Sequence, residues 1–235
     1  MVLHPEPVAQ IREMVKTRPQ PPVLMYDMAH VLGLVGPCFQ EPFQEGAQIV
    51  TGSTHKTFFG TQRGVVACSF REDELEYELW KAIRRRTFPG SVSNHHLGTL
   101  LGLLLAAMEM NAFKDVYQPR VIANAKAFAR ALKGEGLEVE GDPAVDFTET
   151  HQVIVRVRYA KGIETARTLE RNNIILNYQA LPSDEGFTAS SGLRMGVSEM
   201  TRFGMEEADF ANLAHLLAEV VKGGNGFFCR SRRLT

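Results

Sequence analysis

The sequence has few cysteines and no excess of charge, and each shortage excludes classes of protein. Its three cysteines, Cys38, Cys68 and Cys229, are widely spaced and odd in number. We therefore expect a reducing, cytoplasmic environment and no metal site, because the spacing matches no ligand set. The 26 Lys and Arg residues nearly balance the 27 Asp and Glu residues, for a net charge of −1. A near-neutral chain gives no electrostatic reason to expect nucleic acid or an anionic membrane as a partner.

Long hydrophobic runs are also missing. The longest, Leu100 to Met108, contains Gly102 and is far shorter than the roughly 20 residues that span a bilayer. No basic segment leads into an apolar stretch at the N-terminus, so no signal peptide is expected. What remains is the composition of a globular protein of one large or two modest domains, with 44% hydrophobic and 23% charged residues.

Hydrophobic periodicity in the first half of the chain predicts strands that alternate with helices. A helix is expected over residues 6–16, followed by strands at "VLMYDMA", "AQIVTGST" and "GVVACSF". "EDELEYELWKAIRRRT" predicts a helix with acids in its first turn and bases in its last, which complements the helix dipole. "HHLGTLLGLLLAAMEM" is apolar on nearly every face and predicts a buried helix, and an amphipathic helix is expected over 112–132.

The second half has a different pattern. "HQVIVRVR" alternates as an antiparallel strand with one wet face would, and "IILNYQ" and "GLRMGV" predict further strands between two helices. We therefore predict an α/β chain: part of a parallel α/β domain over residues 1–111, then a small α+β domain over residues 112–235. The tail "KGGNGFFCRSRRLT" fits neither pattern and is expected to fray.

Four polar residues stand where strands of the predicted core end or turn: Asp27, His30, Lys56 and Arg194. Each has an ordinary explanation. Asp27 suits a turn or a helix N-cap, His30 a structural histidine, Lys56 a surface loop, and Arg194 an edge strand. Together they meet the needs of pyridoxal phosphate, which requires a lysine to form an imine and an acid to keep its ring nitrogen protonated. An amino-acid substrate adds the need for an arginine that binds its carboxylate.

Four longer motifs make this combination specific. "YDMAHVLGLV", "VTGSTHKTFFGTQRGVV", "NYQALPSD" and "SSGLRMGVSEMTRFGM" resemble serine hydroxymethyltransferase, in the same order and at similar spacing, up to about residue 222. The resemblance implies the C-terminal part of a fold-type I (aspartate-aminotransferase-like) large domain followed by a small α+β domain. It also implies pyridoxal phosphate bound covalently at Lys56, tetrahydrofolate as co-substrate, and a homodimer in the full-length enzyme.

The resemblance also assigns roles to single residues. Lys56 matches the lysine that holds the cofactor, Asp27 the partner of its ring nitrogen, and His30 the partner of its phenolic oxygen. Ser53 and His55 match positions next to the reacting centre, and Arg194 matches the binder of the substrate carboxylate. Arg63 resembles a cofactor-binding arginine that is displaced by one residue from the commonest form.

Two departures from the family pattern are visible. Ser93 and Asn94 replace a glycine pair whose backbone amides reach the cofactor phosphate of the neighbouring subunit, a pattern closer to divergent, archaeal-like members. The N-terminal half of the family fold, with its phosphate loop, has no counterpart, so an incomplete enzyme is expected. Serine hydroxymethyltransferase activity is the main prediction. The alternatives are a threonine aldolase or transaldolase of the same fold, or a truncated, non-catalytic fragment.

Overall fold

The computed structural model describes residues 2–223 and divides them into two compact units. One unit comprises residues 5–118, and the other comprises residues 2–4 with 119–223. The boundary falls inside one long helix, α3 (Leu97–Gly134), as does the boundary near residue 112 that the sequence suggested. All but the first two residues of the predicted tail lie outside the described residues, as does Cys229.

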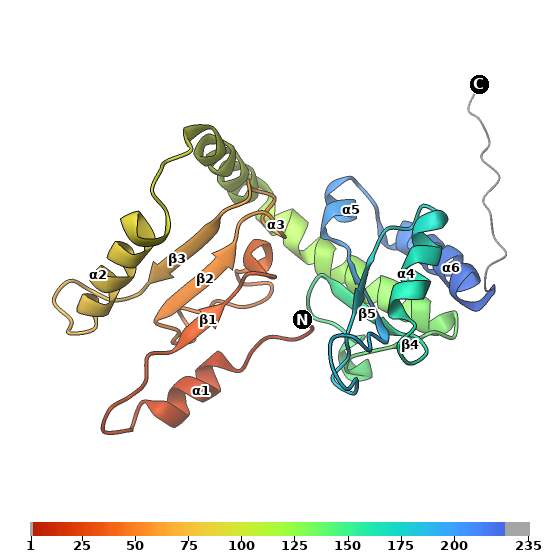
Figure 1. Cartoon of the computed structure of the whole chain (residues 1–235), viewed down its shortest axis with the longest axis horizontal. Helices are drawn as coiled ribbons and strands as arrows, with labels where there is room; N and C mark the ends of the chain where they lie inside the picture. The colour runs from red at the N-terminus through yellow and green to blue at the C-terminus, as the bar shows by residue number, and fades with distance from the viewer. Residues whose placement is uncertain (1, 224–235) are drawn as a thin grey trace. The chain divides into compact units, whose positions relative to one another are not determined.

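The 5–118 unit is built on a three-stranded sheet in the order β1-β2-β3 (Figure 1). Its elements are α1 (Val8–Val15), β1 (Met25–Asp27), η1 (Leu32–Leu34), β2 (Ile49–Ser53), β3 (Gly64–Cys68), α2 (Tyr77–Arg85), η2 (Arg86–Ser91) and the first part of α3. β1 runs parallel to β2, and β3 runs antiparallel to β2. All three strands lie where the sequence predicted them, but β3 runs antiparallel, which differs from the predicted parallel domain.

The other unit contains a four-stranded antiparallel sheet in the order β4-β5-β7-β6. Its elements are β4 (Glu138–Val139), η3 (Pro143–Val145), β5 (Gln152–Arg156), α4 (Gly162–Arg171), β6 (Asn177–Gln179), β7 (Gly192–Gly196), α5 (Ser198–Arg202) and α6 (Glu207–Gly223). Its core joins the sheet to α3, α4 and α6, and the fully buried rings of Phe128 and Phe210 lie 5.5 Å apart between α3 and α6. This is the small α+β fold that the strand alternation predicted.

The expectation of one wet face on β5 is wrong. Gln152, Val153, Ile154 and Val155 are each 3% exposed or less, so side chains that point to both faces of the strand are buried. Residues at the start of the chain explain part of this burial. The backbone N–H of Val2 donates to the side chain of Gln152 (3.2 Å), which places the N-terminal segment over this end of the strand.

The prediction of a buried helix at residues 95–110 is also wrong. These residues form the first part of α3, yet six of its large apolar side chains are at least 53% exposed: Leu97, Leu100, Leu101, Leu104, Leu105 and Met108. The reason is that this part of α3 packs against the rest of the 5–118 unit through its opposite face. Ala106 is 6% exposed there, and Leu103 lies against Gly60. An apolar composition on both faces cannot show from sequence alone which face is covered within the chain.

The same helix changes the expectation about membranes. Within the described residues α3 is the one helix that is long and apolar enough to cross a bilayer by length and composition, although the run 100–108 alone is not. Helices of soluble proteins also meet this criterion, so it does not by itself indicate a membrane protein.

Tyr26 gives a test of how the 5–118 unit is packed. Its hydroxyl is buried in β1 and donates to Oε1 of Gln40 (3.1 Å). Burial, with further contributions from Glu6, Glu45 and Asp27, raises the pKa of Tyr26 to about 12. This folded pKa lies above the value of about 10 for an exposed tyrosine, so the contribution of Tyr26 to stability is complete below pH ~10 and is lost as the pH rises through about 12.

We therefore expect one tyrosine to ionise near pH 12 in an ultraviolet titration of the folded chain. A Tyr26→Phe variant should lack this late component and keep the others. If the late component persists in the variant, another tyrosine produces it and the packing described for Tyr26 is wrong.

Candidate active site

The turn that carries Lys56 is closed by one buried threonine. β2 ends at Ser53, and Thr54 follows with 2% of its surface exposed. The backbone N–H of Thr54 donates to the Arg63 carbonyl (3.0 Å), the Arg63 N–H donates to the Thr54 hydroxyl (3.1 Å), and the Gly60 N–H donates to the Thr54 carbonyl (2.7 Å). These bonds hold residues 54–63 as one compact loop, so the half-buried Lys56 has a fixed backbone at the end of β2.

A second threonine joins this loop to the segment after β1. The Thr57 hydroxyl accepts a hydrogen bond from the Gly33 N–H (3.0 Å) and donates to the His30 carbonyl (3.3 Å), and Thr57 is 2% exposed. The approach is so close that a Cβ at residue 33 would lie 1.9 Å from the Thr57 carbonyl oxygen. Glycine is therefore required at position 33, and the turns with His30 and Lys56 are held against each other.

Asp27 lies at the carboxyl end of β1, where the sequence placed it. β1 and β2 are parallel with Asp27 opposite Thr51, so both strands end at the same edge of the sheet, which is where α/β sheets place their ligands. The Asp27 carboxylate is exposed and accepts a hydrogen bond from the Ala29 N–H (3.0 Å). Within residues 2–223 Asp27 forms no ion pair, and the Lys56 amine has neither a hydrogen bond nor an ion pair. One acid and one amine are thus left unneutralised at this edge.

Arg63 connects the loop with the start of α3. Its guanidinium donates to the Thr99 hydroxyl (Nε, 3.0 Å) and to the His96 carbonyl (3.3 Å). Ser93 and Asn94, the predicted phosphate-binding pair, are exposed and precede these partners by a few residues. The structure therefore brings Arg63 to the segment that follows this pair, an arrangement that the motif alone did not show.

Arg194 belongs to the other unit. It stands in β7 opposite Ile154 of β5 and Asn177 of β6, so β7 is an inner strand and the edge-strand explanation for this arginine is wrong. Its side chain is half-buried, and its guanidinium has no hydrogen bond or ion pair in the part of the chain that the structure describes. A cation on an inner strand without a carboxylate partner is available to bind an anion.

The loop before β7 is fixed by a carboxylate. Asp184 accepts hydrogen bonds from the backbone N–H groups of Leu181 (2.8 Å) and Ser191 (2.9 Å), and these bonds lower the pKa of Asp184. The clamp joins "NYQALPSD" to "SSGLRMG", two motifs that the sequence singled out without showing that they touch.

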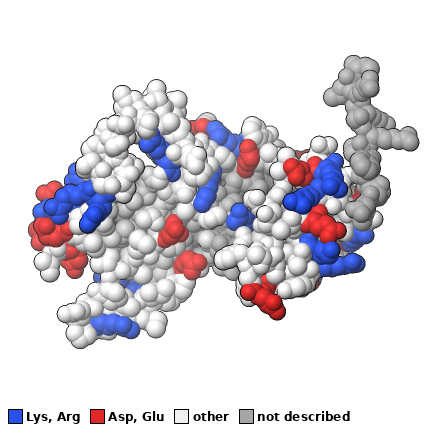
Figure 2. Space-filling view, viewed as in Figure 1, with Lys and Arg blue, Asp and Glu red and all other residues white. Residues whose placement is uncertain are grey.

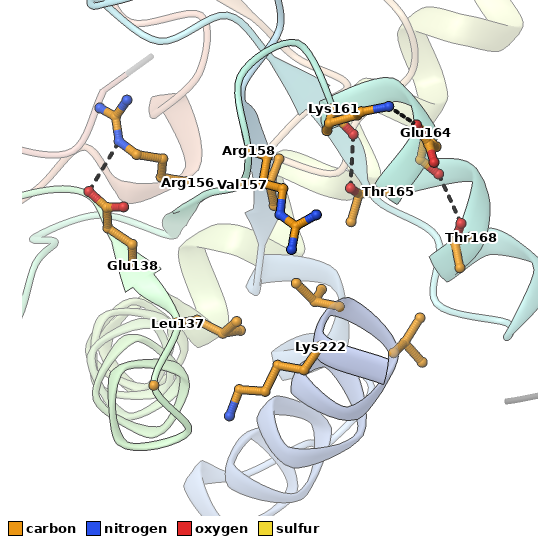
Figure 3. Close-up of a pocket in the computed structure, with 13 residues that line it drawn as sticks. Leu137, Glu138, Arg156, Val157, Arg158, Lys161, Glu164, Thr165, Thr168 and Lys222 are labelled. Atoms are coloured by element: carbon orange, nitrogen blue, oxygen red, sulfur yellow. Dashed lines mark hydrogen bonds and ion pairs between the residues drawn. The ribbon is translucent and has the colours of Figure 1, made fainter. Parts of the chain in front are cut away.

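A hollow in this second unit lies away from the predicted residues. Figure 3 shows it between β4, β5, α4 and the end of α6, with a volume of about 720 Å³. Two of its four lining cations are paired with acids within it, Arg156 with Glu138 (3.3 Å) and Lys161 with Glu164 (2.7 Å). No residue predicted to bind cofactor or substrate lines this hollow. Within the described residues no group of acids, histidines and cysteines is arranged to hold a metal ion.

Comparison with known proteins identifies the family. Residues 8–217 match the family model for serine hydroxymethyltransferase. The chain belongs to the serine hydroxymethyltransferase family. The family model and the α/β fold confirm the predicted family and fold class.

Relatives and a solved structure extend the match. A serine hydroxymethyltransferase of Archaeoglobus fulgidus is 45% identical over 94% of this chain and 49% of the relative, and one of Thermococcus gammatolerans is 47% identical over 84% and 47%. The crystal structure of L-threonine transaldolase from Pseudomonas fluorescens, in an internal aldimine state, aligns with a TM-score of 0.82 at 33% identity, over 94% of this chain and 49% of that one. The chain thus spans about half the length of these proteins, and its archaeal relatives agree with the predicted divergent pattern.

The residues that hold this candidate site together were not predicted. Thr57 and Gly33 lie inside the family motifs, but neither has a side chain that the cofactor chemistry requires, so the sequence did not indicate them. Thr54 and Thr99 were missed for the same reason. Thr57 is recognised by its buried hydroxyl beside Gly33, a glycine that tolerates no side chain. No sequence signal reveals this contact, because the two segments meet only in the folded structure.

The tie through Thr57 is testable by a nearly isosteric change. Thr57→Val removes the hydroxyl and leaves the buried Gly33 N–H without an acceptor, which costs about 1–3 kcal/mol. We expect faster hydrogen exchange at the Gly33 amide and a lower urea midpoint. Thr17→Val, on an exposed turn, is the matched control and should change neither. Unchanged exchange at Gly33 in Thr57→Val would contradict the proposed tie.

Proposed function

We propose that this chain supplies the cofactor-bearing lysine and the substrate-binding arginine of a pyridoxal-phosphate-dependent serine hydroxymethyltransferase. The reaction breaks the Cα–Cβ bond of serine, leaves glycine and passes the one-carbon unit to tetrahydrofolate. The observation that carries the proposal is the pair of unneutralised groups, Lys56 and Asp27, in turns that Thr57 holds together. Family membership supports the choice of cofactor.

The described residues fit this cofactor. A free amine on a fixed backbone suits covalent attachment, because no hydrogen bond or ion pair among residues 2–223 competes for Lys56. The exposed Asp27 carboxylate suits a protonated ring nitrogen, because among the described residues it accepts a hydrogen bond only from a backbone N–H, that of Ala29. When bound, pyridoxal phosphate supplies a sink for the electrons left at Cα as the bond breaks.

The surrounding residues would position the cofactor and keep its ring nitrogen protonated. Asp27 would hold the proton on the ring nitrogen, His30 would hydrogen-bond the phenolic oxygen, and the Ser53 hydroxyl and His55 would lie next to Lys56 in the chain. Arg63 would bind the cofactor. Its hydrogen bond to Thr99 also fixes the loop of residues 54–63 to α3.

Arg194 would orient the substrate. A guanidinium offers two parallel N–H donors to a carboxylate, and the absence of a protein acid beside Arg194 in the described residues leaves both donors available. We assign it the carboxylate of the amino-acid substrate.

The assembly is part of the same proposal. We infer a cytoplasmic homodimer of the full-length enzyme, in which the exposed Ser93 and Asn94 face the cofactor phosphate of the neighbouring subunit. Their exposure in the 5–118 unit supports such a contact.

A second activity is favoured by one observation. The solved structure with a TM-score of 0.82 is a threonine transaldolase, so the same fold serves an enzyme with a different amino-acid substrate. A chimera decides between the two activities: the half of the A. fulgidus relative that this chain does not match, joined to the present chain. Serine cleavage that needs tetrahydrofolate supports the proposal. Threonine cleavage with no gain from folate supports the alternative, and a chimera that binds no cofactor supports a non-catalytic fragment.

In this chimera Lys56→Ala should abolish covalent attachment of pyridoxal phosphate without unfolding the protein, because Lys56 has no protein partner to lose. The measurement is borohydride reduction followed by mass spectrometry of the peptide around residue 56. Lys161→Ala, which breaks an exposed ion pair with Glu164, is the control and should keep the attachment. Full attachment in Lys56→Ala would remove this lysine from the site.

Arg194→Lys keeps the charge and loses the two-pronged geometry. We expect the KM for serine to rise about 10-fold or more, as the loss of a charged hydrogen bond implies, while cofactor attachment at Lys56 stays unchanged. An unaltered KM would exclude Arg194 from the substrate site. Loss of cofactor as well would indicate a structural role instead.

A further inference from the structure

The hollow between β4, β5, α4 and the end of α6 has the size of a small-molecule site (Figure 3). Its volume of about 720 Å³ lies within the roughly 300–1,000 Å³ that is typical of ligand pockets. Part of its wall is apolar, because four of the side chains that line it are aliphatic: Leu137, Val157, Val220 and Val221. Leu137 is buried and the three valines are half-buried. A wall of this kind favours a ligand with an apolar body, which would remove this surface from water.

The charges around the hollow do not balance. It is lined by four cations and two acids, and both acids are already in ion pairs with two of the cations. The other two cations, Arg158 and Lys222, form no ion pair among residues 2–223. Over residues 119–223 as a whole, acids outnumber lysines and arginines, and Figure 2 shows the two signs intermixed over this unit, at the right of the view. The excess of positive charge is therefore a property of the hollow and not of the whole surface.

Lys222 has a structural partner. Its amine donates a hydrogen bond to the carbonyl of Glu135, directly after the end of α3. The N–H groups of Gly136 and Leu137 also donate to carbonyls of the last turn of this helix (2.9 and 3.1 Å). A cation at a helix C-terminus is stabilised by the helix dipole. Lys222 is thus explained as a cap of α3, and its ammonium group keeps further N–H donors.

Arg158 has no such partner. Its guanidinium forms no hydrogen bond or ion pair with any residue that the structure describes, and Figure 3 shows its side chain extending into the hollow. Its backbone is fixed on both sides. The Val157 N–H donates to the Ser191 carbonyl (2.7 Å), and the Lys161 N–H donates to the Arg158 carbonyl (2.9 Å), which closes the turn after β5. A guanidinium that is held in this way without an acid beside it is available to bind a carboxylate or a phosphate.

The hydroxyl groups in the hollow do not compete for this role. Thr165 and Thr168 donate to the backbone carbonyls one turn earlier in the chain, those of Lys161 (2.8 Å) and Glu164 (3.0 Å). Their hydrogens are therefore already used. The donors that remain for a ligand come from Arg158 and from the ammonium group of Lys222.

We propose that this hollow is a binding site for a small organic acid. The Arg158 guanidinium binds its oxyanion through two parallel N–H donors, and its apolar body lies against Leu137 and the three valines. Carboxylate and phosphate groups both offer the paired oxygens that a guanidinium binds. The inference goes beyond the proposed function and does not rest on it, because no residue assigned to cofactor or substrate lines the hollow.

The test titrates the chain with simple probes and follows its methyl signals by NMR. Benzoate and phenyl phosphate carry both an anion and an apolar body, acetate and inorganic phosphate carry only the anion, and benzyl alcohol carries only the body. We expect benzoate or phenyl phosphate to shift the methyl signals of Leu137, Val157 and Val221. It should bind about 10-fold or more tightly than the probes that carry one part, since the ring buries apolar surface. The tighter of the two identifies the head group as a carboxylate or a phosphate.

Arg158→Gln removes the charge from an exposed side chain, so the circular dichroism spectrum should not change. We expect the affinity for the better probe to fall about 10-fold or more, as the loss of a charged hydrogen bond implies. Arg167→Gln is the matched control. Arg167 is an exposed arginine of α4 that has no partner among the described residues and does not line the hollow, so its replacement should leave the affinity unchanged.

Four outcomes would overturn the proposal. Equal weakening by the two variants would show that the probe responds only to overall charge. Acetate and inorganic phosphate that bind as tightly as the aromatic probes would exclude a role for the apolar wall. Shifts confined to residues around Lys56 would place the anion at the candidate active site instead. The absence of shifts at millimolar concentrations of every probe would exclude the site.

Discussion

The candidate site depends on one buried hydroxyl. Thr57 accepts from the Gly33 N–H and donates to the His30 carbonyl, and through these two bonds the turns after β1 and β2 become one rigid edge. Without this hydroxyl, the segment that follows Asp27 and the loop that carries Lys56 would lose these two hydrogen bonds between them. Catalytic groups must be held to within a fraction of an ångström, and a tie of this kind provides such rigidity. Thr57, which ties the two turns together, is thus not one of the residues to which the proposal assigns chemistry.

Much of the fold could be predicted because its signals are local. Short apolar runs gave β1, β2 and β3, and the alternation of "HQVIVRVR" gave an antiparallel strand. Strand ends then located Asp27 and the loop of Lys56, since ligands gather at the carboxyl ends of parallel strands. Motif resemblance added the family, which residues 8–217 confirm. The roles of the single residues remain predictions.

What failed depends on surroundings that periodicity does not encode. The helix of residues 95–110 is apolar on both faces, so its pattern could not tell which face is covered within the chain, and the predicted burial was wrong. β5 was expected to have a wet face, but the N-terminal residues come from far away in the sequence to cover part of it. Thr57, Thr54 and Thr99 were overlooked because a structural hydroxyl has no signature until its partner is placed.

The exposed leucines of α3 also bear on how the chain fares inside a cell. A surface that is satisfied only by association makes the stability of its segment depend on concentration, by mass action. As long as these leucines face water, they are the kind of exposed apolar surface on which chaperones and proteases act.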